Sequence, residues 1–81
     1  MSPPRILTAK AIENHILLIE FENAKKKKYD ILPLLEKEMF SPLKNPVLFK
    51  SVRVEKGGYA IFWNDDIDIS EYELWKHGKE M

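Results

Sequence analysis

Two stretches near the amino terminus show the hydrophobic pattern of β-strands. Residues 6–11 and 16–21 are rich in aliphatic side chains, and Glu13, Asn14 and His15 lie between them. Asn14 can adopt the positive φ that a tight reversal requires, so the two stretches predict a β-hairpin. In the second stretch, apolar residues occupy both faces of the strand: Leu17, Ile19 and Phe21 lie on one face, and Ile16 and Leu18 lie on the other. Two apolar faces favour a central position in a sheet.

A second reversal, at residues 22–24, leads into a third predicted strand. Residues 25–29 are four lysines and a tyrosine, so their position along the chain, rather than apolar alternation, predicts the pairing. Asp30 is suited to be the N-cap of a short helix that extends to about Lys37. Pro33 falls in the first turn of that helix, where a missing amide hydrogen costs nothing.

Prolines interrupt the middle of the chain. Pro42 and Pro46 lie in the stretch 41–46, which predicts two successive stops in regular structure. Asn45 precedes Pro46 as a helix cap would, so one helical turn is expected to carry the apolar residues 47–49 inward.

A period of two returns after residue 51 and predicts a second hairpin. Val52 and Val54 alternate with charged residues, and Gly57-Gly58 separates them from a strand over 59–63. A glycine pair between two such runs is a strong hairpin signal.

The C-terminal segment carries a helix-start signal. Ser70 with Glu73 three residues later is a capping box, which opens a helix from Glu71 to about His77 that Gly78 ends.

The complete element order is β-β-β-α-β-β-α. It predicts an α+β fold, with one mostly antiparallel sheet of about five strands and short helices on one side. We expect a single domain over residues 1–81, with a disordered N-terminus at 1–5 and a frayed C-terminus at 78–81.

Composition narrows the class of protein. The 81 residues contain no cysteine, so no disulfide, thiolate nucleophile or cysteine-rich zinc site is available, and a reducing cytoplasm is expected. Thirteen Lys and Arg balance thirteen Asp and Glu. Residues 1–50 carry nine basic and six acidic side chains (+3) and residues 51–81 carry four and seven (−3), so the molecule is dipolar if the halves occupy different faces. Apolar runs such as residues 16–19 are too short to span a bilayer.

A run of four lysines offers one candidate site. Lys25, Lys26, Lys27 and Lys28 could contact the phosphates of a nucleic acid, which releases counterions. The alternative is a solvated strand that positive charge protects from edge-to-edge pairing. Strand alternation sends Lys25 and Lys27 to the face of Tyr29 and the other two lysines to the opposite face, so the four charges do not form one patch.

The acidic stretch after the last predicted strand is a second candidate site. Asn64, Asp66 and Asp68 alternate like the first three ligands of a calcium-binding EF-hand loop, but Ile69 and Trp75 occupy the positions of the required glycine and glutamate. No metal, cofactor or catalytic residue is therefore expected.

The structural interpretation is a connection between two elements. Tyr59, Ile61 and Trp63 would end a buried strand, and Asp65 with Asp66 would form the reversal after it. Asp68 and Ser70 would then position the last helix. His15 and His77 are expected to be solvated, since no catalytic partner lies at a recognisable spacing.

Two aromatic residues on the last helix are informative about packing. A helix this short cannot be stable alone and must dock through an apolar face. Trp75 and Tyr72 are therefore core residues or, where they fail to dock, candidate contacts with a partner. Core is the favoured interpretation.

Four segments together resemble a known bacterial family, domain of unknown function 2442. They are the hairpin ending at Phe21, the step from Tyr29-Asp30-Ile31 into Pro33-Leu34-Leu35, the connection from Phe40-Ser41-Pro42-Leu43 to Phe49, and Trp63 to Asp68-Ile69 with Leu74-Trp75. Members usually carry Asp/Asn-Gly after that phenylalanine and Asn-Gly after that tryptophan. Here the turns read Asn23-Ala24 and Asp65-Asp66, so Ala24, in the reversal at residues 22–24, stands where most members have glycine.

The resemblance implies no catalytic residues. Some members of the family precede a helix-turn-helix DNA-binding domain, and many are encoded beside a small toxin-like protein. It therefore implies a non-enzymatic protein-binding module, as the antitoxin-like partner of a small basic toxin encoded nearby. The candidate partner contacts are Asp65, Asp66, Asp68, Tyr72 and Trp75. The alternative is a nucleic-acid-associated or transcription-linked domain acting through Lys25, Lys26, Lys27 and Lys28.

Overall fold

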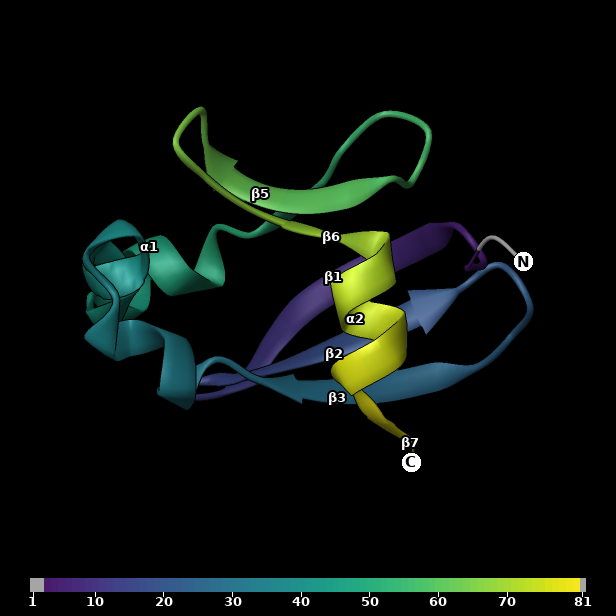
Figure 1. The fold of residues 1–81 in the computed structure, drawn as a ribbon, viewed down its shortest axis with the longest axis horizontal. Helices are drawn as coiled ribbons and strands as arrows, with labels where there is room; N and C mark the ends of the chain where they lie inside the picture. The colour runs from purple at the N-terminus through teal and green to yellow at the C-terminus, as the bar shows by residue number, and fades with distance from the viewer. Residues whose placement is uncertain (1–2, 81) are drawn as a thin grey trace.

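The computed structural model describes residues 3–80, in which three N-terminal strands and one C-terminal strand form a four-stranded antiparallel sheet (Figure 1). The strand order is β1-β2-β3-β7. The three predicted N-terminal strands are confirmed, as is the central place of the second one between its neighbours. The bounds are β1 (Ile6–Glu13), β2 (Ile16–Phe21), β3 (Lys26–Asp30) and β7 (Lys79–Glu80).

A second, three-stranded sheet lies over the first, in the order β4-β5-β6 (Figure 1). The prediction of one sheet with about five strands is therefore wrong in count, although the α+β class is confirmed. Two strands, β6 and β7, were missed. In β6, Ile67 and Ile69 alternate with polar residues over only four positions, which a helix entry also allows, and β7 has two residues. The bounds are β4 (Arg53–Val54), β5 (Ala60–Asn64) and β6 (Ile67–Ser70).

Three short helices connect the first sheet to the second, and a fourth lies between β6 and β7 near the C-terminus. The stretch 41–46, predicted to stop regular structure, instead includes the end of a 3-10 helix that contains Pro42. The lost amide hydrogen bond of a proline matters less there, because a 3-10 helix of two turns has few internal bonds to lose. The bounds are η1 (Leu32–Glu36), η2 (Glu38–Lys44), α1 (Pro46–Lys50) and α2 (Glu71–His77).

Side-chain caps set the beginnings of these helices. The Asn45 side chain accepts from the amides of Val47 and Leu48, and Ser70 Oγ accepts from the amide of Glu73 at 3.2 Å, as predicted. Residues 47–49 were predicted to point inward, but only Phe49 is fully buried. Leu48 is half-buried, and Val47 is 78% exposed. A single turn of helix can present only one side to the core.

The first helix begins one residue later than predicted. Ile31 occupies the N-cap position of η1, and the helix is of the 3-10 type. Asp30 still serves this entry, because its Oδ1 accepts a hydrogen bond from the amide of Leu32 at 2.8 Å.

The reversals differ from the expected backbone geometry at one position. Ala24 has φ +70° and is the one non-glycine residue with positive φ within residues 3–80, so Asn14 does not adopt the predicted positive φ. A β-bulge between Ala11 and Glu13 accompanies the first hairpin instead. Gly57 and Gly58 have φ of +92° and +77°, as the predicted glycine turn requires.

The hydrophobic core lies between the two sheets. Trp63 stacks on Phe49 with ring centroids 6.3 Å apart, and its Nε1 donates to the Phe49 carbonyl at 2.9 Å. Tyr59 is 51% exposed, so the predicted buried face of β5 holds only for Ile61 and Trp63. The facing residues are Leu17, Ile19, Phe21 and Tyr29 from the first sheet and Ile61, Trp63, Ile67 and Ile69 from the second.

The chain ends were expected to be disordered or frayed. Residues 1, 2 and 81 lie outside the described residues. Lys79 and Glu80 pair with β3 as β7, so the described chain continues beyond α2 as a strand. Fraying at 78–81 stays a prediction. Within residues 3–80, no helix has both the length and the apolar character needed to cross a membrane.

Candidate functional site

The predicted reversal at Asp65-Asp66 is present as the turn between β5 and β6. The Asn64 side-chain oxygen accepts hydrogen bonds from the amides of Asp66 (2.8 Å) and Ile67 (3.0 Å), which orders the turn. Asp65 and Asp66 are both exposed. Because Asn64 is used inside the turn, it is not poised as a calcium ligand. Residues 3–80 contain no group of three or more candidate metal ligands.

Asp68 lies on β6, which is an edge strand of the second sheet. A groove of about 270 Å³ runs beside this edge and has apolar side chains from η1 and η2 along its other wall. Two carboxylates and one lysine also line the groove. The lining side chains that matter here are Tyr29, Leu34, Lys37, Phe40, Asp68 and Glu73.

A hydrogen bond between β3 and α2 lies at the floor of this groove. Tyr29 Oη donates to Glu73 Oε2 at 2.9 Å, and His77 Nε2 lies 3.8 Å from Glu73 Oε1. Burial of the Tyr29 ring, assisted by the hydrogen bond and charge of Glu73, raises the pKa of the phenol well above its usual value. The contact joins residues that are 44 positions apart, so the sequence offered Glu73 only as a capping residue.

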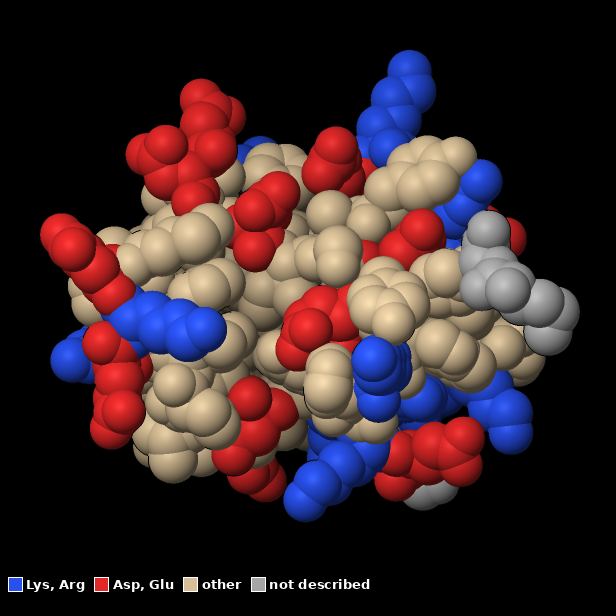
Figure 2. All heavy atoms as spheres, in the orientation of Figure 1, with Lys and Arg blue, Asp and Glu red and all other residues tan. Residues whose placement is uncertain are grey.

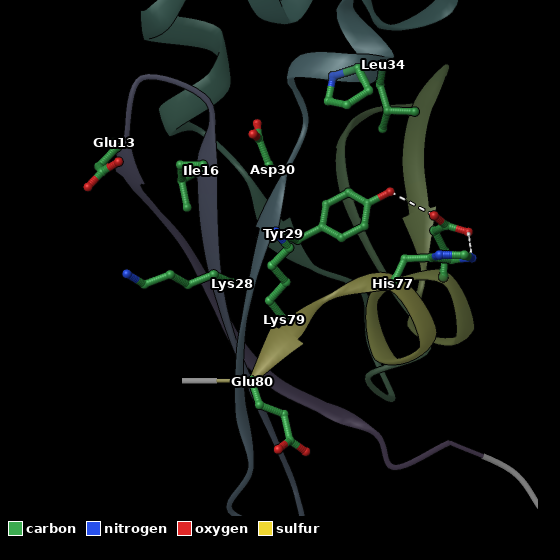
Figure 3. A pocket seen from close by; sticks show the side chains of 11 residues that line it. Glu13, Ile16, Lys28, Tyr29, Asp30, Leu34, His77, Lys79 and Glu80 are labelled. Atoms are coloured by element: carbon green, nitrogen blue, oxygen red, sulfur yellow. Dashed lines mark hydrogen bonds and ion pairs between the residues drawn. The ribbon is translucent and has the colours of Figure 1, made fainter.

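A larger concavity, of about 740 Å³, continues from the same hydrogen bond over the edge of β3 (Figure 3). Lys28, Ile16 and Glu13 point to one side of β3, whereas Tyr29 and His77 point to the other. The strand separates these groups, so they do not converge on one point as the acid, base and nucleophile of a catalytic site would.

The aromatic residues of α2 divide between the core and the surface. The Trp75 ring meets Phe21 edge-on at 5.1 Å, and Lys27 Nζ lies 4.0 Å from the centroid of the Trp75 ring. Lys27 also donates to the Trp75 carbonyl. Trp75 is half-buried and docks within the chain, whereas Tyr72 is 55% exposed.

The lysine run alternates as predicted. Lys27 is only 8% exposed and lies on the buried face with Tyr29, whereas Lys26 and Lys28 are exposed on the other face. Lys25 lies at the β2–β3 turn and is exposed. Lys27 therefore stabilises the α2 contact and is not placed to meet a phosphate.

The two histidines each lie near a carboxylate. His15 is half-buried, and its Nδ1 lies 2.8 Å from Asp30 Oδ1. His77 is exposed near Glu73. The prediction that the histidines are solvated is therefore confirmed for His77. His15, at the β1–β2 turn, is instead half-buried and contacts Asp30.

Carboxylates mark the face that carries the second sheet and α2. Figure 2 shows them above the β5–β6 turn at the upper left and further down, over β6 and α2. Within residues 3–80, both ion pairs are between a histidine and a carboxylate, so Asp65, Asp66 and Asp68 have no lysine or arginine within 4 Å.

Comparison with known proteins places the chain in a family. The model of the family described as "Protein of unknown function (DUF2442)" matches residues 6–80, so the chain belongs to this family. No curated protein matches the chain, and no solved structure does.

Proposed function

We propose that this chain is a non-enzymatic protein-binding module whose partner is a small basic protein, in the manner of an antitoxin that holds a toxin. The observation that carries this proposal is the groove beside β6. Asp68 and Glu73 line the same groove as Leu34 and Phe40. An apolar wall with a few fixed carboxylates suits an extended segment that carries lysine or arginine.

The edge of β6 adds a second element of recognition. Its outer backbone groups have no strand partner within residues 3–80. A partner segment can hydrogen-bond to such an edge and place alternate side chains in the groove. Backbone pairing supplies affinity, and the carboxylates select basic side chains.

The exposed carboxylates of the β5–β6 turn extend this acidic surface. Complementary charge accelerates encounter with a basic partner and suppresses acidic ones. A cytoplasmic location, which the lack of cysteine favours, is part of the proposal because such a partner would be met there.

Co-expression with the product of the neighbouring gene tests the proposal. We expect a stable complex in size-exclusion chromatography at micromolar concentration. Reversing Asp65, Asp66 and Asp68 to lysine should weaken it by about tenfold or more, since several attractive contacts become repulsive.

The matched control reverses three exposed glutamates that do not line the groove, Glu13, Glu22 and Glu55, to lysine. This control makes the same change in net charge and should leave most of the affinity intact. Separate elution of the two wild-type proteins would contradict the proposal, as would equal loss in both triple variants.

A further inference from the structure

The outer face of the first sheet, which points away from the second sheet, collects lysines from distant parts of the chain. The strand register pairs Lys10 with Leu18, Leu18 with Lys28, and Lys28 with Lys79. Directly paired residues of antiparallel strands point to the same face, so these four side chains form one row across all four strands. We refer to Lys10, Lys28 and Lys79 as the lysine row.

The lysine row is unfavourable for the stability of the isolated fold. Lys28 and Lys79 are direct cross-strand neighbours, and like charges in such a pair repel. No ion pair within residues 3–80 involves a lysine, so nearby carboxylates do not compensate this repulsion at contact distance. A local arrangement that costs stability without compensation is characteristic of a functional surface.

Aliphatic side chains lie between the lysines. Leu18 occupies the middle of the row, and Ile16 lies two residues along β2 on the same face. Both side chains are half-buried. The residues of this face are all exposed or half-buried: Thr8, Lys10, Glu13, Ile16, Leu18, Glu20, Lys26, Lys28, Asp30 and Lys79.

The acidic residues of the same face do not neutralise the positive charge of the lysine row. Asp30 Oδ1 accepts from the amide of Leu32 and lies 2.8 Å from His15 Nδ1, and within residues 3–80 no lysine forms an ion pair with this carboxylate. Glu20 is paired across the strands with Lys26, and Glu13 with Ile16, so both belong to the rows on either side of the lysine row.

We propose that this outer face is a second docking surface, and that its occupant is an amphipathic helix of a partner protein with acidic residues on both flanks of an apolar stripe. Leu18 and Ile16 are about 7 Å apart along β2, close to the pitch of one helical turn. Lys10 lies on one side of Leu18 and Lys28 with Lys79 on the other, each strand about 5 Å from the next. Carboxylates that flank an apolar stripe therefore meet a lysine on either side.

The composition of the face favours a protein helix over a nucleic acid. Single-stranded nucleic acid is held by aromatic side chains on which bases stack, and the face has none among its described residues. Its two aliphatic side chains match an apolar stripe instead. This surface has the opposite charge to the groove beside β6 and lies on the other sheet, so the inference stands independently of the proposed function.

An NMR titration of the isotope-labelled full chain tests the inference. The probe is a helical peptide of about 15 residues with leucine at every third or fourth position and glutamate on both flanks. We expect amide shifts at Lys10, Leu18, Lys28 and Lys79. Replacing all three lysines of the row by glutamine should raise the apparent Kd about tenfold, the sum of three modest ion pairs.

The matched control replaces Lys44, Lys50 and Lys56, which are exposed elsewhere, by glutamine and should leave the Kd within about twofold of wild type. Two further probes are the same peptide with lysine in place of glutamate and a single-stranded DNA oligonucleotide. Shifts at the row with DNA but not with the acidic peptide would overturn the inference in favour of phosphate binding. Absent shifts, shifts elsewhere, or equal loss in the two triple variants would also overturn it.

A second readout is independent of the probe. Because the row repels itself, the glutamine variant Lys28→Gln should raise the melting temperature, and Lys56→Gln should not. An unchanged or lowered melting temperature for Lys28→Gln would contradict the claim that repulsion within the lysine row destabilises the fold. Melting curves of the two triple variants, recorded in the same way, verify that the proteins used in the titration are folded.

Discussion

Individual residues carry strain and hydrogen bonds that follow directly from their backbone positions. Ala24 has φ +70°, a region where a Cβ is crowded and where glycine is favoured. Ala24→Gly should therefore stabilise the fold by about 0.5–1 kcal/mol after the extra entropy of unfolded glycine is deducted. Thermal unfolding measures this gain. A melting temperature that stays the same or falls would contradict the role of the left-handed turn.

Gly58 provides the comparison of opposite sign. It has φ +77°, and a Cβ at this position would lie 2.5 Å from the Ile6 carbonyl oxygen. Gly58→Ala should therefore lower the melting temperature, because both the backbone angle and the contact are unfavourable.

The phenol of Tyr29 predicts a pH dependence of stability. Burial raises its pKa above the unfolded value of about 10, so the unfolded state ionises first as pH rises. The stability due to this group is complete below pH 10 and is lost above it. Tyr29→Phe should cost about 1 kcal/mol at pH 7, and the gap to wild type should narrow above about pH 10.

Urea unfolding at several pH values measures this gap. Tyr59→Phe, at an exposed tyrosine, is the control and should stay parallel to wild type. A constant gap between Tyr29→Phe and wild type from pH 7 to about pH 11 would show that the phenol ionises equally in both states.

Short elements depend on caps and on docking, because none is long enough to be stable alone. The Asn45 side chain accepts from the amides of Val47 (2.9 Å) and Leu48 (3.5 Å) at the start of α1. Asn45→Ala should cost about 1 kcal/mol of unfolding free energy, the usual loss for an N-cap. Chemical denaturation measures the loss.

The control for this prediction is Asn14→Ala. Asn14 lies in a turn, is exposed, and makes no side-chain hydrogen bond within residues 3–80. It should change stability by less than about 0.5 kcal/mol. Equal losses at the two asparagines would show that the cap of α1 contributes nothing specific.

The whole molecule holds together through one layer of side chains between two sheets. Trp63 is 3% exposed, stacks on Phe49 and bonds to its carbonyl, so it joins the second sheet to α1. Trp63→Ala should cost about 3–5 kcal/mol, a large share of the stability of so small a domain. Trp75→Ala, at the half-buried tryptophan, should cost roughly half as much. Equal and small losses of unfolding free energy for both substitutions would contradict the central place of Trp63 in the core.

Charge is also arranged at the scale of the whole molecule. The first half of the chain, which carries the excess of basic residues, supplies β1, β2 and β3 of the first sheet. The second half, which carries the excess of acidic residues, supplies the second sheet and α2, and its last strand, β7, joins the first sheet. Calcium or magnesium at millimolar concentration should nevertheless leave the melting temperature nearly unchanged, because Asn64 is used within its turn. A rise of several degrees with calcium would make the acidic turn a metal site.

The sequence by itself determined the local structure of this protein. Strand alternation predicted that Lys27 and Tyr29 share a face, and the Asn45 and Ser70 caps predicted helix starts, because these features depend on near neighbours only. The family followed from the order of motifs along nearly the whole chain.

Tertiary structure alone decided the division into two sheets, the Tyr29–Glu73 hydrogen bond and the lysine row. Each depends on which strand lies beside which, and strand order is set by non-local packing that no local pattern encodes. Lys10 and Lys79 carried no signal as single residues. They lie in one row only because β1, β2, β3 and β7 align in one register, which places distant charges at the spacing of adjacent strands.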